Sequence, residues 1–111
     1  MIEYQSSRLD NVYGALSDGT RRKMLQRLSR GTLTIGALAE PLPISFAAAS
    51  KHVQVLERAG LVRRERVGRE HHITMVEKPL HDAADWATRT AEFWERRLDL
   101  LEQYLNTETK P

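Results

Sequence analysis

Apolar side chains recur between residues 80 and 105 at alternating intervals of four and three, which is typical of one long helix with a continuous apolar seam. Pro79 suits the first turn of such a helix, where its missing amide proton costs nothing. A helix with this much apolar surface needs a packing partner, and two-fold self-association is the commonest way to provide one. We therefore expect a dimerisation helix over about 79–105, with packing on the chain's own core as the alternative. The seam consists of Leu80, Ala84, Ala87, Ala91, Trp94, Leu98, Leu101 and Leu105, and Trp86, Phe93 and Leu100 widen it on one flank.

The pattern of residues 9–59 predicts four short helices, separated by residues that start or stop a helix. Predicted N-caps are Asp18, Thr34 and Ser45, and predicted stops are Gly31, Pro41, Pro43 and Gly60. The last of the four helices runs from Ser45 to about Ala59. Helical spacing assigns the apolar faces to Leu9, Val12, Tyr13 and Leu16, then Met24, Leu25 and Leu28, then Ile35, Leu38 and Ala39, then Ala49, Val53 and Leu56.

Two extended stretches follow at 62–67 and 70–75, and the Gly68-Arg69 pair between them is typical of a tight hairpin turn. A short helix, a proline-containing turn, a second helix and a hairpin are the parts of a winged helix-turn-helix. The expected fold is mainly α with a small β-hairpin wing, in the order α-α-α-α-β-β-α, and dimeric. We expect one domain over 1–111, with the helix-turn-helix at about 34–59 and the wing at about 62–75.

Positive charge is concentrated in the middle of the chain. Residues 45–74 contain six Lys or Arg and three Asp or Glu, whereas residues 76–111 contain five and eight. A basic centre suits a polyanionic partner, here double-stranded DNA. Arg21, Arg22 and Lys23 fit phosphate contacts and plain surface charge equally well.

The second helix of a helix-turn-helix places its N-terminal residues against base edges in the major groove. Small side chains there allow a close approach, Lys51 offers a donor, and Phe46 offers apolar contact to a thymine methyl group. A basic hairpin suits the phosphate backbone or the minor groove, although Glu65 and Glu70 also fit an ordinary solvated hairpin. The expected DNA contacts are Ser45, Phe46, Ala47, Ser50, Lys51, His52 and Gln54 on the helix, and Arg64, Arg66, Arg69 and His71 on the wing.

Two motifs carry a resemblance to a known family: Leu-Ser-Asp-Gly-Thr-Arg-Arg at 16–22 and Ala-Ser-Lys-His-Val-Gln-Val-Leu-Glu-Arg-Ala-Gly-Leu-Val at 49–62. Over roughly residues 9–105 the chain resembles the ArsR/SmtB family of transcriptional repressors. The resemblance implies a dimeric winged-helix repressor that leaves its operator when an inducer binds. Gly19 stands where the family usually has proline, and Ile73 where a wing tyrosine is common. Dimer contacts are then expected from the first and last helices, at Leu9, Tyr13, Ala87, Ala91, Trp94, Leu98 and Leu101.

The chain departs from the metal sensors of that family. They carry cysteines on the helix before the recognition helix, whereas this chain has no cysteine, and residues 35–40 offer no thiol. His81 and Asp85 could share one face of the last helix, but that helix contains only one histidine. We therefore expect no metal and no cofactor. A metal-responsive repressor with a His/carboxylate site on the last helix is the alternative.

Other classes of function find less support. The sequence lacks a thiol nucleophile, a Gly-x-Ser-x-Gly motif and a phosphate-binding glycine loop, so we do not expect an enzyme. A winged-helix protein–protein interaction module would expose more large apolar residues than the polar Ser50-Lys51 face does. No apolar run approaches the ~20 residues of a membrane span, and the N-terminus lacks a signal-like apolar segment. These features predict a cytoplasmic protein without membrane contacts and with an unknown inducer.

Overall fold

Three capping side chains set the starts of the helices in the first half of the fold. Asp18, Thr34 and Ser45 each accept a hydrogen bond from the backbone N–H three residues later, at 3.0, 3.1 and 3.0 Å. They begin α2 (Gly19–Leu28), α3 (Ile35–Ala39) and α4 (Phe46–Arg58). All three predicted N-caps are therefore confirmed.

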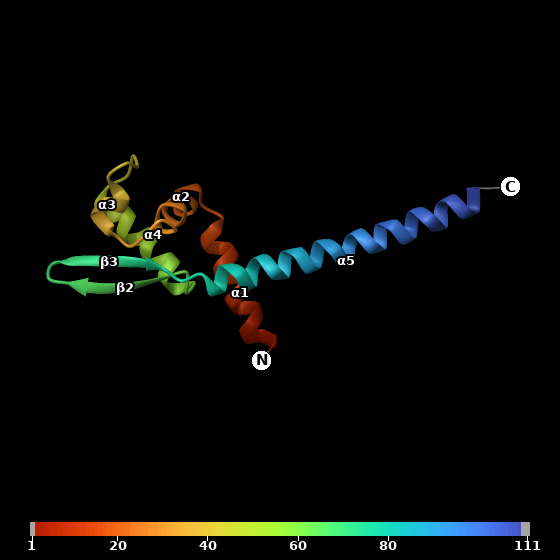
Figure 1. Cartoon of the computed structure of the whole chain (residues 1–111), viewed down its shortest axis with the longest axis horizontal. Helices are drawn as coiled ribbons and strands as arrows, with labels where there is room; N and C mark the ends of the chain where they lie inside the picture. The colour runs from red at the N-terminus through yellow and green to blue at the C-terminus, as the bar shows by residue number, and fades with distance from the viewer. Residues whose placement is uncertain (1, 110–111) are drawn as a thin grey trace. The chain divides into compact units, whose positions relative to one another are not determined.

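The structure is a computed structural model that describes the backbone of residues 2–109 and the side chains of residues 7–107. The chain divides into two compact units between residues 81 and 82. The first unit holds α1 to β3 and the start of α5, and the rest of α5 (Lys78–Thr109) forms the second. Figure 1 labels these elements in chain order, and they follow the predicted mainly helical, winged arrangement.

Two helices are longer than predicted. α1 spans Ile2–Leu16, although the apolar spacing is visible only from Leu9 onward. α5 begins at Lys78 and ends at Thr109, beyond the last member of its apolar seam. Both extensions consist mainly of polar residues, which continue a helix without leaving an apolar period in the sequence.

The sheet has three antiparallel strands in the order β1-β3-β2. β2 (Val62–Val67) and β3 (Glu70–Met75) form the predicted hairpin, and Gly68 adopts a φ of 64° at its turn. β1 (Leu33–Thr34) pairs with the other edge of β3, Leu33 opposite Ile73. β1 was not predicted from the sequence, because a strand of two residues contains no alternation to detect.

The core lies where α2, α3 and α4 meet the inner side of the sheet (Figure 1). α4 contributes Ala49, Val53 and Leu56, all fully buried, so the opposite face of this helix points outward. The predicted inward faces of α2, α3 and α4 are confirmed. In α1 the buried residues are Val12 and Ala15, whereas Tyr13 is 37% exposed.

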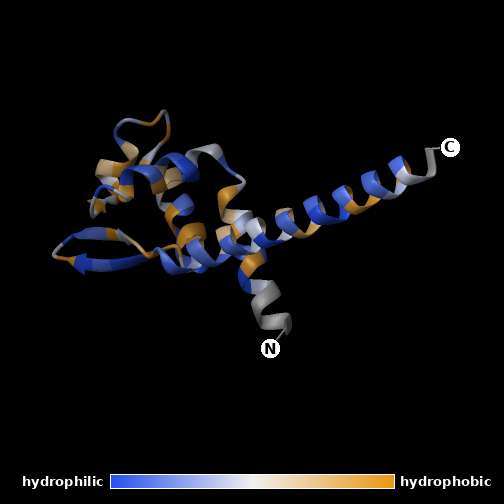
Figure 2. Ribbon diagram, turned by 45° about the vertical axis from the view of Figure 1, so that its right-hand side comes forward, coloured by the Kyte–Doolittle hydropathy of each residue, from blue (hydrophilic) through white to orange (hydrophobic). Residues whose placement is uncertain are grey.

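The second unit carries several large apolar side chains that are exposed. Trp94 is 57% and Leu98 61% exposed, and Leu101 and Leu105 are similarly open. Figure 2 shows hydrophobic and hydrophilic residues alternating along this part of α5. None of the helices within residues 2–109 is both long and apolar enough to cross a membrane.

The cap on α4 gives a test of the fold. Ser45→Ala removes the acceptor for the Ala48 N–H and should lower the free energy of unfolding by about 1 kcal/mol. Ser45→Asp keeps an acceptor at the same place and should retain most of the stability. Urea denaturation of the three proteins measures the difference, and equal stability of Ser45→Ala and the parent would contradict the assigned cap.

Candidate nucleic-acid interface

The N-terminal turns of α4 carry both polar and apolar side chains on the outward side of the helix. Phe46 is 59% exposed, and Ala47, Lys51 and Gln54 are also exposed, while Ser50 is half-buried. The first turn of α4 contains no acidic residue. The backbone N–H groups and their partial positive charge therefore meet no competing carboxylate at this end of the helix.

His52 differs from these neighbours because one edge of its ring faces the protein. Its Nδ1 lies 3.2 Å from a guanidinium nitrogen of Arg21 and 3.9 Å from Oδ2 of Asp18. About a quarter of the side chain, 23%, is exposed. The Nδ1 edge of the ring therefore packs against Arg21, and the opposite edge is the part of His52 that could make the expected DNA contact.

Three of the expected wing residues share one side of the hairpin. Arg64 stands opposite Ile73 and Arg66 opposite His71, so their side chains project from the same face as the buried Ile73. Arg64 donates a hydrogen bond to Glu57 of α4 at 3.3 Å. This contact joins the wing to the last turn of α4.

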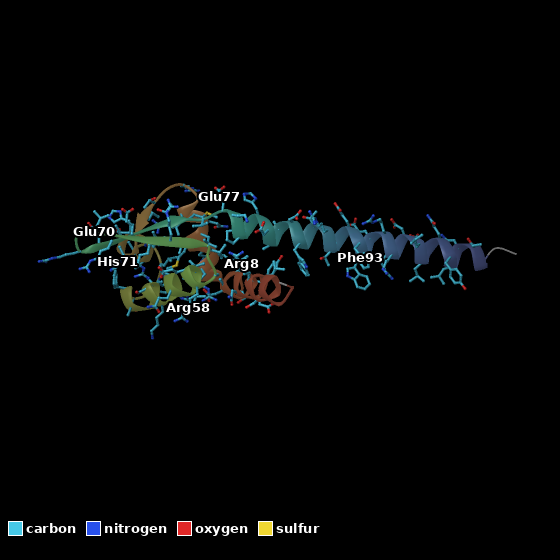
Figure 3. All side chains as sticks on the ribbon, turned by 90° about the horizontal axis from the view of Figure 1, so that it is seen from below. Arg8, Arg58, Glu70, His71, Glu77 and Phe93 are labelled. Atoms are coloured by element: carbon cyan, nitrogen blue, oxygen red, sulfur yellow. The ribbon has the colours of Figure 1, made fainter. Side chains whose placement is uncertain are left out.

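The outer part of the wing is more open. Arg66 donates from Nε to the carbonyl of Gly68 at 3.1 Å and so braces the turn. Arg69 is exposed at the tip. Figure 3 labels Glu70 and His71 on this outer part of the hairpin, and the Nδ1 of His71 is buried without a hydrogen-bond partner among the described residues.

The sequence did not reveal the role of the arginines that begin α2. Arg21 donates from Nε to the carbonyl of Ala15 at 2.7 Å and from a terminal nitrogen to that of Gly14 at 3.2 Å. Arg22 donates to the carbonyl of Leu16 at 2.7 Å. Both arginines thus cap the C-terminal end of α1, where unpaired carbonyls attract cations. A signal was present, since both arginines follow within six residues of Leu16, the last apolar position of the first predicted helix.

Asp18 completes this junction between α1 and α2. The hydrogen bond from the Arg21 backbone N–H lowers the pKa of Asp18, and the nearby charge of Arg21 acts in the same direction against partial desolvation. Asp18 is therefore a carboxylate at neutral pH. It provides the negative charge in an otherwise basic cluster.

The remaining expected residues lie in two places. On α1, Leu9 is half-buried and Tyr13 partly exposed, and on α5 the side chains of Ala87, Ala91, Trp94, Leu98 and Leu101 are exposed. Figure 3 shows Phe93 projecting from the same helix. The histidine considered for metal binding, His81, lies 3.7 Å from Glu77, and Asp85 pairs with Arg89 at 3.2 Å. Across the part of the chain that the structure describes, no group of three potential metal ligands comes together.

Known proteins with similar sequences are transcriptional regulators. Residues 16–65 match the sequence profile of a helix-turn-helix domain family. The chain is 36% identical over 108 residues to the HTH-type transcriptional regulator Rv2034 of Mycobacterium tuberculosis, covering 97% of this chain and 96% of that protein. It is 35% identical over 78 residues to the transcriptional repressor SdpR of Bacillus subtilis, covering 70% of this chain and 87% of the repressor.

Solved structures agree with these sequence matches. An ArsR-like transcriptional regulator from Rhodococcus sp. RHA1 superposes with a TM-score of 0.78 at 35% identity, covering 89% of this chain and 93% of that one. The homodimeric winged helix-turn-helix DNA-binding domain of a possible ArsR-family regulator from Mycobacterium bovis gives 0.62 at 25% identity, covering 86% of each chain. Fold and matches together define a winged helix-turn-helix transcriptional regulator. Within that class, the chain belongs to the ArsR family.

The Glu57–Arg64 pair provides a test of the interface. Glu57→Gln removes a negative charge beside the basic face and should raise the affinity for any duplex DNA by about threefold at low salt. Arg64 is 21% and Glu57 40% exposed, so the pair is partly screened by solvent and the free energy of unfolding should fall by about 1 kcal/mol or less. Glu77→Gln, at the residue just before α5, is the matched control and should leave DNA affinity unchanged. Fluorescence anisotropy measures the DNA affinity of both variants. Identical affinities for the two would exclude Glu57 from the DNA-facing surface.

Proposed function

We propose that this protein is a homodimeric, sequence-specific transcriptional repressor that binds an inverted-repeat operator. The single observation that carries the proposal is the joining of the exposed face of α4 to the basic wing through the Glu57–Arg64 hydrogen bond. Both are anchored on a buried apolar core, so their relative position is fixed before DNA arrives. A preorganised surface loses less entropy on binding than one that must order itself.

The α4 helix is proposed to read bases. With its N-terminus in the major groove, Phe46 and Ala47 supply apolar contact to thymine methyl groups, and Ser50, Lys51 and Gln54 supply hydrogen bonds. His52 offers its outer ring edge to the same groove or to the flanking phosphates. The wing is proposed to hold the DNA backbone and the minor groove through Arg66, Arg69 and His71, with Arg64 serving also as the link to α4.

The dimer is proposed to form through the apolar seam of α5, with Leu9 and Tyr13 of α1 contributing. The exposed Trp94, Leu98 and Leu101 support this assignment, because a second copy is the simplest cover for a self-complementary apolar stripe. The related domain from Mycobacterium bovis is itself described as homodimeric. Two copies related by a two-fold axis would set their α4 helices into successive major grooves, ~34 Å apart.

Repression then results from occupation of the operator by the dimer. A dimer seated on an inverted repeat that overlaps a promoter blocks polymerase, and the related SdpR is named a transcriptional repressor. An inducer would act by weakening that complex. Soft metals are poor candidates, because the chain has no cysteine to bind them. We propose a non-enzymatic, cytoplasmic role in which DNA and a second copy are the partners.

DNA selectivity tests the proposal directly. A selection of bound duplexes from a random pool should yield one inverted-repeat site, and its affinity should fall steeply with salt while staying above that for competitor DNA. Lys51→Ala should weaken the selected site more than competitor DNA, by about tenfold against little change, because a base contact is lost. Arg69→Ala should weaken both to a similar degree, because a phosphate contact carries no sequence information. Equal weak binding of every sequence by the parent would refute the specific-repressor proposal.

The proposed dimer makes a separate prediction. Light scattering of the parent should give twice 12.7 kDa. Replacing Trp94 and Leu98 together with glutamate should produce monomer or unfolded chain, because charges cannot be buried in an apolar seam without a partner. Arg96→Glu, a charge change on the opposite side of the same helix, should remain dimeric. A dimer unaffected by the seam substitutions would place the interface elsewhere.

A further inference from the structure

Arg21 connects two elements that the proposed function treats separately. Its guanidinium caps the carbonyls of Gly14 and Ala15 at the end of α1, and NH1 of the same group lies 3.2 Å from Nδ1 of His52 on the recognition helix. Its backbone N–H is held at the same time by Asp18. The side chain is therefore fixed at several points, and the ring of His52 meets a donor whose position is set by the first two helices.

The chemistry of the two groups determines where the proton of His52 resides. A guanidinium has only donors, so a hydrogen bond between it and Nδ1 requires Nδ1 to accept. A neutral imidazole that accepts at Nδ1 carries its hydrogen on Nε2. Asp18 also lies near Nδ1, but its Oδ2 is 3.9 Å away, beyond hydrogen-bond distance.

The outer edge of the ring is left for a ligand. Nε2 makes no hydrogen bond within the described residues and is not among the buried polar atoms that lack a partner. His52 lies on α4 one residue after Lys51 and two before Gln54, both exposed. An Nε2–H at this position is a donor suited to an acceptor on DNA, either a phosphate oxygen or a purine N7 or O6.

We propose that Arg21 is a positioning residue for DNA recognition, which selects the Nε2–H tautomer of His52 so that α4 presents a fixed donor. The proposal rests on the proposed DNA-binding function. It assigns to Arg21 a role distinct from the phosphate contact that its charge alone suggests. The neighbouring Arg22 caps α1 in the same way without touching His52, and so separates capping from tautomer selection.

The tautomer is measurable without DNA. In ¹⁵N spectra of the dimer, recorded at a pH where imidazoles are neutral, His52 of the parent should carry its hydrogen on Nε2. Arg21→Met should shift the population toward Nδ1–H, whereas Arg22→Met, which loses a comparable cap, should leave it unchanged. A parent in the Nδ1–H form, or an Arg21→Met protein with the parental tautomer, would overturn the proposal. If Arg21→Met fails to fold, the substitutions of His52 below still test the proposal.

Substitutions of His52 test the consequence for DNA. The amide nitrogen of asparagine occupies the place of Nδ1 and that of glutamine the place of Nε2. His52→Asn should therefore lose about tenfold in affinity for the selected site, and His52→Gln should recover most of that loss. Loss confined to the selected site identifies a base acceptor, and equal loss on competitor DNA identifies a phosphate. Either pattern supports an Nε2–H donor on His52, and the ¹⁵N spectra of Arg21→Met test whether Arg21 positions it.

The positioning role of Arg21 and the repressor function can be refuted separately. If the parent binds its selected site and His52→Asn binds it equally well, the role of Arg21 is refuted while the repressor function stands. If the parent binds no site selectively, the repressor function is refuted, whatever the tautomer of His52.

Discussion

The packing of α4 onto the core is the constraint on which the rest of the structure depends. Ala49, Val53 and Leu56 are fully buried, so the helix has one permitted rotation about its axis. That rotation decides which side chains face outward and makes Phe46, Lys51 and Gln54 a surface rather than a scattered set. Ala49 also keeps the helix close to its neighbours, because a larger side chain there would push α4 away from the core.

The parts of the fold that were predictable from the sequence are those with local causes. Asp18, Thr34 and Ser45 act on a backbone amide three residues away, and Gly68 shapes a turn of two residues, so short motifs suffice to place them. Strand β1 and the capping by Arg21 and Arg22 escaped prediction. β1 depends on the pairing of Leu33 with Ile73, which are brought together only when the chain folds. The capping depends on whether an arginine side chain binds the end of a helix or extends into solvent.

The candidate site shows the same division. The exposed residues of α4 followed from helical periodicity, because the outward face is the complement of the apolar one. The hydrogen bond from Arg64 to Glu57 could not be predicted in this way. Strand alternation predicts the face of the sheet from which Arg64 projects, but not the residue of α4 that it contacts. The half-buried position of His52 was likewise not predictable, because Arg21 is 31 residues away in the sequence. Sequence patterns identify a surface, whereas contacts between elements determine how its members are oriented.

The two-residue turn at Gly68, braced by Arg66, has a consequence for how such proteins diversify. With the turn fixed, the reach of the wing depends only on strand length, and each residue adds about 3.3 Å. Adding one residue to each strand would turn the basic side chains to the other face of the hairpin, so only additions of two preserve the surface. Wing length in relatives of this protein should therefore change in steps of about 6.6 Å, or nearly two base pairs of DNA.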